Sequence, residues 1–551
     1  MKLDKRQLMT GAIGLGCAAA APLKAAQLAD INFDKIARGP FEPNWASLET
    51  QYKTPDWFRD AKFGLWAHWG PQCVPEAGDW YARHMYIQGH AQYDHFVNNY
   101  GHPADTGFID LLPRWKAENW NPDALLDLYV KAGAKYFVAM ANHHDNFDMF
   151  ESRFHDWNST KIGPKKDIVG IWAKAARARG LKFGVSNHSA HVWHWFQTAY
   201  GYDPEGPRKG KRYDAFRLNK LDGKGKWWEG LDPQEFYGGS VYPLPDGLET
   251  KKAALDWHEA NDRVWDEKPP LRNPAFTRQW YLRCKDLVDT YQPDLLYFDN
   301  FDLPLGQTGL DMAAHYYNAS MQWHGGKLEG VINVKPHGPF NGGLVADVER
   351  GSRTDISPEP WQTDTCIGQW HYNRRLYDQK KYLPAADVIH RLCDIVSKNG
   401  NLLLSVPMRP DGTIDSEERK IVEDIGSWMS RFSEAIYGTR PWRIYGEGPT
   451  QVGAGMFGER NQQPFTEKDI RFTTKGRTLY AMTLGRPVDG TTTITSLARG
   501  SKLTKGRVAR VEVVGVPSPL NFRQDASGLH ISIPDTASHA FGVALKITGV
   551  I

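Results

Sequence analysis

The chain has 551 residues, of which 41% are hydrophobic and 24% are charged. This composition excludes an intrinsically disordered protein, and the length predicts more than one domain. The formal net charge is +3, and residues 1–25 carry all of that excess, so the remaining chain is close to neutral. A neutral chain without a basic run argues against nucleic acid as a partner.

Residues 1–26 have the pattern of an export signal peptide. Lys5 and Arg6 precede an apolar run over residues 8–21, and Ala25 and Ala26 follow it. The run is too short and too weakly apolar to cross a membrane, and small residues behind it are typical of a cleavage site. The Lys5-Arg6 pair resembles a twin-arginine signal in which lysine replaces the first arginine. We therefore expect a bacterial protein that is periplasmic or secreted and has no membrane span.

From residue 63 onward, strand-like apolar runs alternate with helix-like segments. Strands are expected at 63–70, 136–141, 182–186, 294–299, 330–335 and 401–407, and helices at 122–133, 168–180, 280–291 and 385–399. This alternation predicts parallel βαβ units in a sheet that is covered on both faces. No GxGxxG motif follows the first strand, which argues against a dinucleotide-binding fold. We predict an α/β protein with a catalytic (β/α)8-like (TIM) barrel over residues 40–438.

Two segments depart from this alternation. Residues 200–275 are rich in Gly, Pro, Trp and charge and show little periodicity. We interpret them as a long excursion that either covers the active-site face of the barrel or forms a peripheral or oligomer contact. After residue 439, short alternating runs are separated by turn residues. They predict a C-terminal antiparallel β-sandwich over residues 439–551.

The expected strand ends carry most of the candidate functional groups. In a (β/α)8 barrel the active site lies at the carboxyl ends of the strands. In this sequence those ends and the residues just beyond them carry His68, His143, His144, Asp145, Asn187, His188, Asp299, Lys335 and, after the fifth predicted strand, Glu349. This concentration of titratable side chains predicts an active site there.

Asp299 follows the apolar and aromatic run 295–298. A charge at the end of a buried strand costs several kcal/mol unless it is solvated or paired. It is either a carboxylate that caps the next loop or a glycosidic nucleophile. A retaining glycosidase needs a second carboxyl group about 5–5.5 Å away, and Glu349 and Glu359 are the candidates for that acid/base. The alternative for both glutamates is a solvated or ion-paired surface side chain.

The histidines permit two interpretations. A metal-dependent barrel hydrolase would use His143, His188 and His191 as ligands. The His-x-His of such hydrolases is missing from the first strand, where His68-Trp69-Gly70 stands, and the chain has no CxxC pair. Neutral imidazoles that hydrogen-bond sugar hydroxyls explain the cluster without a metal. We therefore expect neither a metal nor another cofactor.

A set of ordered motifs carries a family resemblance over roughly residues 45–550. They are Phe63-Gly-Leu-Trp-Ala-His-Trp-Gly70, Asn142-His-His-Asp-Asn-Phe147, Gly163-Pro-Lys-Lys-Asp-Ile-Val169, Pro293-Asp-Leu-Leu-Tyr-Phe-Asp-Asn300, Pro360-Trp-Gln-Thr-Asp-Thr365, Val396-Ser-Lys-Asn-Gly-Asn-Leu-Leu-Leu404 and Glu434-Ala-Ile-Tyr-Gly-Thr-Arg-Pro-Trp442. Through these motifs the sequence resembles glycoside hydrolase family 29, the α-L-fucosidases.

The resemblance implies a retaining α-L-fucosidase that acts on a fucosylated oligosaccharide or polysaccharide. By position, Asp299 resembles the family nucleophile, and His68, His143 and His144 resemble its hydroxyl-binding histidines. The family acid/base lies in a variable loop, so we take Glu349 first and Glu359 second. The full set of candidate substrate-binding residues is His68, Trp69, Trp80, His143, His144, Asn187, His188, Tyr297, Lys335 and Trp361.

Three positions differ from the family pattern. Tyr297 stands where Trp is common, Asn187-His188 where Tyr is common, and Asn333-Val-Lys335 where Asn-Asp-Arg-Trp is common. Lysine cannot reproduce the guanidinium fork of arginine. These changes leave open an α-L-galactosidase of the same mechanism, because L-galactose differs from L-fucose only by a hydroxyl at C6. A catalytically inactive glycan-binding protein is the third alternative.

Overall fold

The structure of the protein is a computed structural model, and it describes residues 36–263, 265, 267–271, 273–336 and 342–551. The predicted signal peptide at residues 1–26 lies outside the described residues. Residues 37–551 form one compact unit. Within the described part of the chain, no helix is both long enough and apolar enough to cross a membrane.

An eight-stranded parallel sheet forms the first half of this unit. Its strands lie in the order β6-β5-β4-β3-β2-β1-β8-β7. The two edge strands are also joined, because Asp347 beyond β6 forms a parallel bridge with Gln362 of β7. The sheet is therefore a nearly closed barrel, and the predicted fold class is confirmed. The strands are β1 (Phe63–Ala67), β2 (Tyr136–Asn142), β3 (Lys182–Asn187), β4 (Leu295–Phe298), β5 (Val331–Val334), β6 (Val345–Ala346), β7 (Trp361–Cys366) and β8 (Gly400–Ser405).

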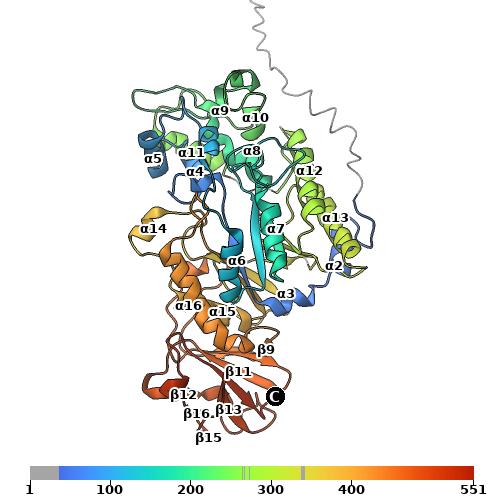
Figure 1. Cartoon of the computed structure of the whole chain (residues 1–551), viewed down its shortest axis with the longest axis vertical. Coiled ribbons are helices and arrows are strands. Elements are labelled where there is room, and N and C mark those ends of the chain that lie inside the picture. Colours follow the sequence, from blue (N-terminus) through green and yellow to red (C-terminus); the bar gives the residue numbers. More distant parts are fainter. Residues whose placement is uncertain (1–35, 264, 266, 272, 337–341) are drawn as a thin grey trace, which may run out of the picture. The chain divides into compact units, whose positions relative to one another are not determined.

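Helices connect most of the strands and cover the outside of the barrel (Figure 1). The sequence sets their ends: Asn121 caps α6 from its side chain with Pro122 in the first turn, and Asp415 and Glu418 form a capping box on α16. The main connecting helices are α6 (Pro122–Lys131), α7 (Ile168–Ala178), α12 (Pro274–Tyr291), α13 (Gln307–Trp323), α15 (Ala385–Ser397) and α16 (Ser416–Phe432). Shorter helices are α2 (Trp45–Gln51), α3 (Asp56–Ala61), α4 (Tyr81–His84), α5 (Ala91–Asn99), α8 (Val192–Trp195) and α14 (Arg374–Asp378).

The strands of the barrel are buried on both sides. Every residue of β1, β2, β7 and β8 is buried, as a sheet enclosed by helices requires. Polar side chains nevertheless fill part of the interior. Tyr136 donates a hydrogen bond to Gln362, which in turn donates to Asp347 at 2.5 Å. This polar filling explains why β7 has no apolar run in its sequence.

The excursion between β3 and α12 contains more regular structure than its sequence indicates. Among its described residues, those beyond residue 200 form the helices α9 (Asp214–Arg217), α10 (Pro233–Phe236) and α11 (Lys251–Asn261). The 11 residues of α11 correct the expectation of little periodicity. Thr250 caps this helix by accepting a hydrogen bond from the N–H of Ala253.

The C-terminal region consists of antiparallel sheets. Six strands lie in the order β14-β13-β17-β11-β10-β9, and three lie in the order β12-β16-β15. Figure 1 shows these strands in orange to red. Their bounds are β9 (Arg440–Glu447), β10 (Ile470–Lys475), β11 (Thr478–Thr483), β12 (Thr491–Ile494), β13 (Arg510–Val513), β14 (Val516–Pro519), β15 (Phe522–Asp525), β16 (Gly528–Ser532) and β17 (Ala544–Thr548).

Candidate active site

Four consecutive strands end in polar residues that meet at one end of the barrel. β1 is followed by His68, β2 by His143 and His144, β3 by His188, and β4 by Asp299. Because the strands are parallel and neighbours in the sheet, their carboxyl ends lie together. The structure thus brings together five of the residues that the sequence singles out.

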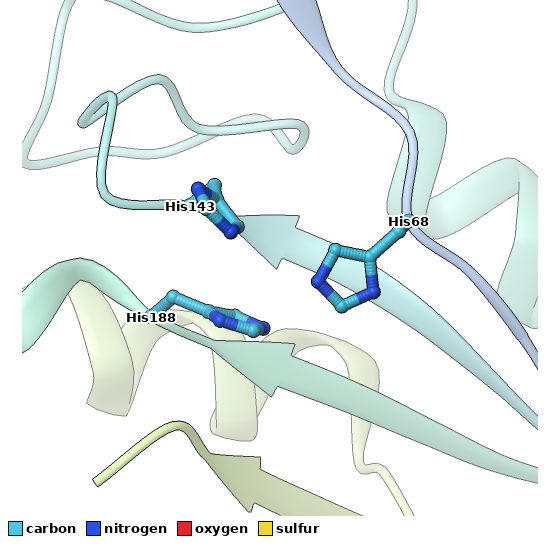
Figure 2. A group of neighbouring side chains, drawn as sticks. All are labelled: His68, His143 and His188. Carbon is cyan, nitrogen blue, oxygen red and sulfur yellow. The ribbon is translucent and has the colours of Figure 1, made fainter. Parts of the chain in front are cut away.

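Three of these histidines form a compact cluster. Figure 2 shows the rings of His68, His143 and His188 gathered beyond the ends of their strands. The ring centroids of His143 and His188 are 4.8 Å apart, and His68 lies 5.1 Å from His188 and 5.6 Å from His143. Burial lowers the pKa of all three imidazoles. They are therefore neutral at neutral pH, and each can donate one hydrogen bond and accept another.

The tautomer of His143 follows from its neighbour. The carboxamide oxygen of Gln72 accepts from the N–H of Ala82, so its nitrogen faces Nδ1 of His143 at 2.8 Å. Since an amide nitrogen only donates, Nδ1 is the acceptor and the proton of the neutral ring is on Nε2. This arrangement suits a hydroxyl oxygen, whereas a metal ion would need an unprotonated nitrogen there.

Among the residues that the structure describes, two groups of side chains have the spacing of a metal site. They are His68, His143 and His188, and His144, His188 and Asp299, with one ligand atom from each residue within 4.8 Å of the others. The protonated Nε2 of His143 conflicts with the first group. In the second group, Nδ1 of His144 faces the carbonyl oxygen of His188 at 2.7 Å and so carries a proton, but Nε2 is the atom that faces Asp299, so this proton does not exclude the second group.

Asp299 is held by three side chains at the cluster. Its Oδ2 lies 3.1 Å from Nε2 of His144 and 3.3 Å from Nδ1 of His188, and its Oδ1 contacts Nζ of Lys335. Burial raises the pKa of this carboxyl, but Lys335 and the two histidines outweigh burial and hold the pKa well below its usual range. Asp299 is therefore ionised. Its side chain is still 16% exposed, so a ligand can reach it.

Lys335 joins Asp299 to a second carboxylate. The same Nζ lies 2.5 Å from Oε2 of Glu349, which follows the short strand β6 by three residues. Burial lowers the pKa of Lys335, yet Asp299, Glu349 and Asp364 together raise it well above its usual value. The lysine is thus a buried ammonium that is shared by two carboxylates.

A second acidic pair lies inside the barrel, next to this lysine. Asp347 and Asp364 share a hydrogen bond, and the hydroxyl of Tyr297 donates to Asp364 at 3.1 Å. Burial raises the pKa of Asp347 to about 6, and burial together with Asp347 and Glu349 raises that of Asp364 well above its usual range. Asp364 is the protonated partner, because a hydrogen bond between two carboxyl groups needs one proton.

Aromatic side chains surround the histidines, and sequence analysis named two of them, Trp80 and Tyr297. The ring of Trp80 lies 6.3 Å from that of His144, and the ring of Trp265 lies closer, at 5.6 Å. Trp370 lies 5.1 Å from His68, and His371 lies 4.8 Å from His143. Trp370 and His371 follow β7, so the rule of strand ends would have found them if β7 had been recognised. Trp265 belongs to the excursion, and no spacing in the sequence indicates its position.

The excursion also contributes a carboxylate next to Asp299. Glu267 accepts a hydrogen bond from the N–H of Phe301 at 2.8 Å and contacts the side-chain nitrogen of Asn300. Its other neighbour is His191, at 3.2 Å. Sequence analysis assigned His191 to a metal alternative, whereas the structure pairs it with this glutamate.

Four predicted residues do not join the cluster. The indole N–H of Trp69 donates to the carbonyl of Arg409, and its ring packs on Trp115 and Trp120. Asn187 accepts hydrogen bonds from the N–H and hydroxyl of its neighbour Ser189. The first is a core residue and the second stabilises the turn after β3.

Trp361 and Glu359 lie at the amino-terminal end of β7, opposite the end where the cluster lies. Trp361 begins the strand, is fully buried, and donates its indole N–H to the carbonyl of Lys398. Glu359 precedes it and is exposed. Because the cluster lies at the carboxyl ends of the strands, Glu359 cannot reach Asp299, and Glu349 is the only one of the two glutamates in the site.

Comparisons with known proteins agree with this geometry. The family model Alpha-L-fucosidase matches residues 29–434, and the model Alpha-L-fucosidase C-terminal domain matches residues 462–548. The tissue alpha-L-fucosidase of Homo sapiens is 26% identical over 520 residues, which covers 93% of this chain and 92% of that protein. The plasma alpha-L-fucosidase of Homo sapiens is 25% identical over 536 residues, with 93% of each chain covered.

Solved structures share the fold. A Thermotoga maritima alpha-fucosidase in complex with fucose superposes with a TM-score of 0.67 at 24% identity, covering 92% of this chain and 100% of that one. The alpha-L-fucosidase isoenzyme 1 from Paenibacillus thiaminolyticus superposes with a TM-score of 0.57 at 21% identity, covering 90% and 98%. The family model spans most of the chain, including every strand of the barrel. The chain therefore belongs to the alpha-L-fucosidase family and is a glycoside hydrolase with alpha-L-fucosidase activity.

Proposed function

We propose that the protein is a retaining exo-glycosidase that removes terminal α-L-fucosyl groups from fucosylated glycans, with Asp299 as nucleophile and Glu349 as acid/base. The observation that carries this proposal is the position of Lys335. Because its Nζ contacts both carboxylates, their nearest oxygens lie within about 5 Å of each other, close to the separation that a retaining mechanism requires.

In the first step, an oxygen of ionised Asp299 attacks C1 of the sugar. The bond from C1 to the leaving oxygen breaks, and Glu349, which takes up a proton before this step, gives that proton to the leaving oxygen. In the second step, water attacks C1, Glu349 takes the proton of the water, and the bond to Asp299 breaks. The two displacements release L-fucose with retained configuration.

The histidine cluster supports a sugar as the ligand. Among the described residues, Nδ1 of His68 and Nε2 of His188 are buried and have no hydrogen-bond partner. Buried polar atoms without partners are costly, and sugar hydroxyls would satisfy them by donating or accepting. The ammonium of Lys335, the buried cation that contacts Asp299, is neutralised by the two carboxylates and does not provide a site for an anionic sugar.

Azide rescue tests both assignments at once. Asp299→Gly should lower kcat/KM for 4-nitrophenyl α-L-fucoside by more than about a thousandfold, and azide should restore turnover with β-L-fucosyl azide as the product. Glu349→Ala should instead give α-L-fucosyl azide, because azide then attacks the covalent intermediate from the opposite face. Full activity in Asp299→Gly would show that Asp299 is not the nucleophile. Parallel assays with 4-nitrophenyl α-L-galactoside distinguish the α-L-galactosidase alternative.

We also propose that the protein is exported and acts in the periplasm or outside the cell. The basic start, the apolar run and the small residues at Ala25 and Ala26 support this proposal. Expression in a bacterial host followed by N-terminal sequencing tests it. A mature chain that begins near residue 27 in the periplasmic fraction is expected, and an uncleaved chain confined to the cytoplasm would contradict it.

A further inference from the structure

The segment that carries Glu349 is hydrogen-bonded to the C-terminal region. The carbonyl oxygen of Glu349 accepts from the N–H of Phe457 at 2.8 Å, and that of Arg350 accepts from the N–H of Glu459 at 3.0 Å. Phe457 and Glu459 lie in the connection between β9 and β10, beyond the last strand of the barrel. The backbone on which Glu349 stands is therefore fixed from outside the barrel.

Glycine permits this close approach. The N–H of Gly455 donates to the carbonyl of Ser352 at 2.9 Å, and the two residues form an antiparallel bridge. Gly351 lies between Glu349 and Ser352 in the sequence. A Cβ added at Gly351 would collide with the carbonyl oxygen of Gly455. The two segments are in backbone contact, and any side chain at position 351 would push them apart.

Arg350 has a backbone conformation that needs support. Its φ is +45°, in the left-handed region that residues other than glycine rarely adopt. Such conformations persist when surrounding contacts determine them, and they concentrate at functional sites. Here the guanidinium donates to Glu459 at 2.8 Å and to the carbonyl of Gly368 at 3.0 Å, and it lies 4.7 Å from the ring of Trp370, which packs on His68.

Glu459 is in turn anchored to the barrel. Its second oxygen accepts from the hydroxyl of Thr365 in β7 at 2.8 Å and contacts the guanidinium of Arg391 in α15. The side chain is 14% exposed. One glutamate of the C-terminal region thus connects β7, α15 and the residue next to Glu349.

We infer that the C-terminal region positions Glu349 for proton transfer, with Glu459 as the positioning residue that acts through Arg350. This inference rests on the proposed role of Glu349 as acid/base. An acid must reach the leaving oxygen to within hydrogen-bond distance, and a displacement of about 1 Å can cost two orders of magnitude in rate. The pairing of 349–352 with 455–459 fixes that distance.

A leaving-group series measures the effect. Aryl α-L-fucosides whose phenols range from weakly to strongly acidic need acid catalysis to different degrees, because an acidic phenol leaves without a proton. Glu459→Gln should lower kcat/KM about tenfold for the phenyl fucoside and less than about twofold for the 2,4-dinitrophenyl fucoside. Gly351→Ala, which separates the same segments without removing a charge, should give the same pattern.

Controls separate positioning from folding and from the acid assignment itself. Asp535→Asn removes a surface ion pair with Arg486 in the same region, and it should leave kcat/KM unchanged for both the phenyl and the 2,4-dinitrophenyl fucoside. Melting temperatures and far-ultraviolet circular dichroism show whether the variants fold. Suppose that the loss of kcat/KM in Glu349→Ala depends strongly on the acidity of the leaving phenol. If Glu459→Gln then loses activity equally on every substrate, or loses no activity, the positioning role is wrong. If the loss of kcat/KM in Glu349→Ala is the same for every leaving group, Glu349 is not the acid, and the inference is wrong as well.

Discussion

The ammonium nitrogen of Lys335 lies 2.5 Å from Oε2 of Glu349, and it also contacts Oδ1 of Asp299. Lys335 follows β5, while the two carboxylates follow β6 and β4, the strands on either side of it. A single buried cation therefore lies between both proposed catalytic groups. We expect the charge of this lysine to control the ionisation of the nucleophile.

Lys335→Met should move the acid limb of the pH profile of kcat/KM to higher pH. In the intact protein, burial raises the pKa of Asp299, and the opposing effect of Lys335 and two histidines keeps that pKa well below its usual range. Without the ammonium the pKa rises, so a smaller fraction of Asp299 is ionised at any acidic pH. The profile of kcat/KM reports the pKa values of the free enzyme and measures this shift.

Lys335→Arg is the matched control, because arginine keeps the charge at nearly the same place. Its acid limb should stay with that of the wild type even if its maximum activity changes. If Lys335→Met and the wild type have the same acid limb, Asp299 is not the group whose titration limits the reaction at low pH.

Glu349→Gln and Glu359→Gln should have opposite outcomes. The first removes the proposed acid/base and should lower kcat/KM for 4-nitrophenyl α-L-fucoside by about a hundredfold or more, the usual contribution of general acid–base catalysis. The second changes an exposed residue before β7, at the far end of the barrel, and should leave the rate unchanged. Steady-state kinetics of the two variants identify the acid/base. A loss of kcat/KM in Glu359→Gln alone would assign that role to Glu359.

A chelator should leave the activity unchanged. The hydrogen bond from Gln72 to Nδ1 of His143 leaves the proton of that ring on Nε2, so this ring has no free lone pair for a metal ion. Assays after prolonged incubation with excess chelator, together with elemental analysis of the purified protein, measure the effect. Activity that is lost and then restored by Zn²⁺ would favour the metal-dependent alternative instead.

The fold could be predicted from the sequence wherever burial is uniform. β2 and β3 are short apolar runs bounded by helices with clear caps, and their predicted and observed ranges agree within a residue. β6 escaped prediction because two residues carry no periodicity. β7 escaped because Gln362 and Asp364 point polar groups into the barrel, where Tyr136, Tyr297 and Asp347 satisfy them. A strand whose buried side chains are hydrogen-bonded to other strands has no local signature.

The missed strands account for most of the errors at the site. Trp361 is a candidate substrate-binding residue in the sequence because its position at the start of a strand cannot be recognised there, and Trp370 is missed for the same reason. The residues after β1 to β4 were found because their strands were found. The contribution of Trp265 depends on how the excursion folds back against His144, which is a tertiary contact that no local pattern encodes.

Asp364→Asn should stabilise the protein increasingly as the pH rises. Burial, Asp347 and Glu349 raise the pKa of Asp364 well above its usual value, so the folded protein keeps a proton that the unfolded chain releases near pH 4. The stability that this proton contributes is fully present below about pH 4 and is lost as the pH rises toward the folded-state pKa. Asparagine has no proton to lose and can still accept the hydrogen bond from Tyr297.

The measurement is the difference in melting temperature between Asp364→Asn and the wild type at constant ionic strength. Taking the difference cancels the groups that do not contact Asp364, including the buried histidines, whose lowered pKa values act in the opposite sense, whereas Asp347 titrates together with Asp364 and contributes to the difference. The difference should grow in favour of the variant between about pH 5 and pH 8, because the wild type alone must keep a carboxylic acid protonated in that range. A difference that is independent of pH would show that Asp364 has the same pKa in the folded and unfolded states, and that the pair with Asp347 does not share a proton.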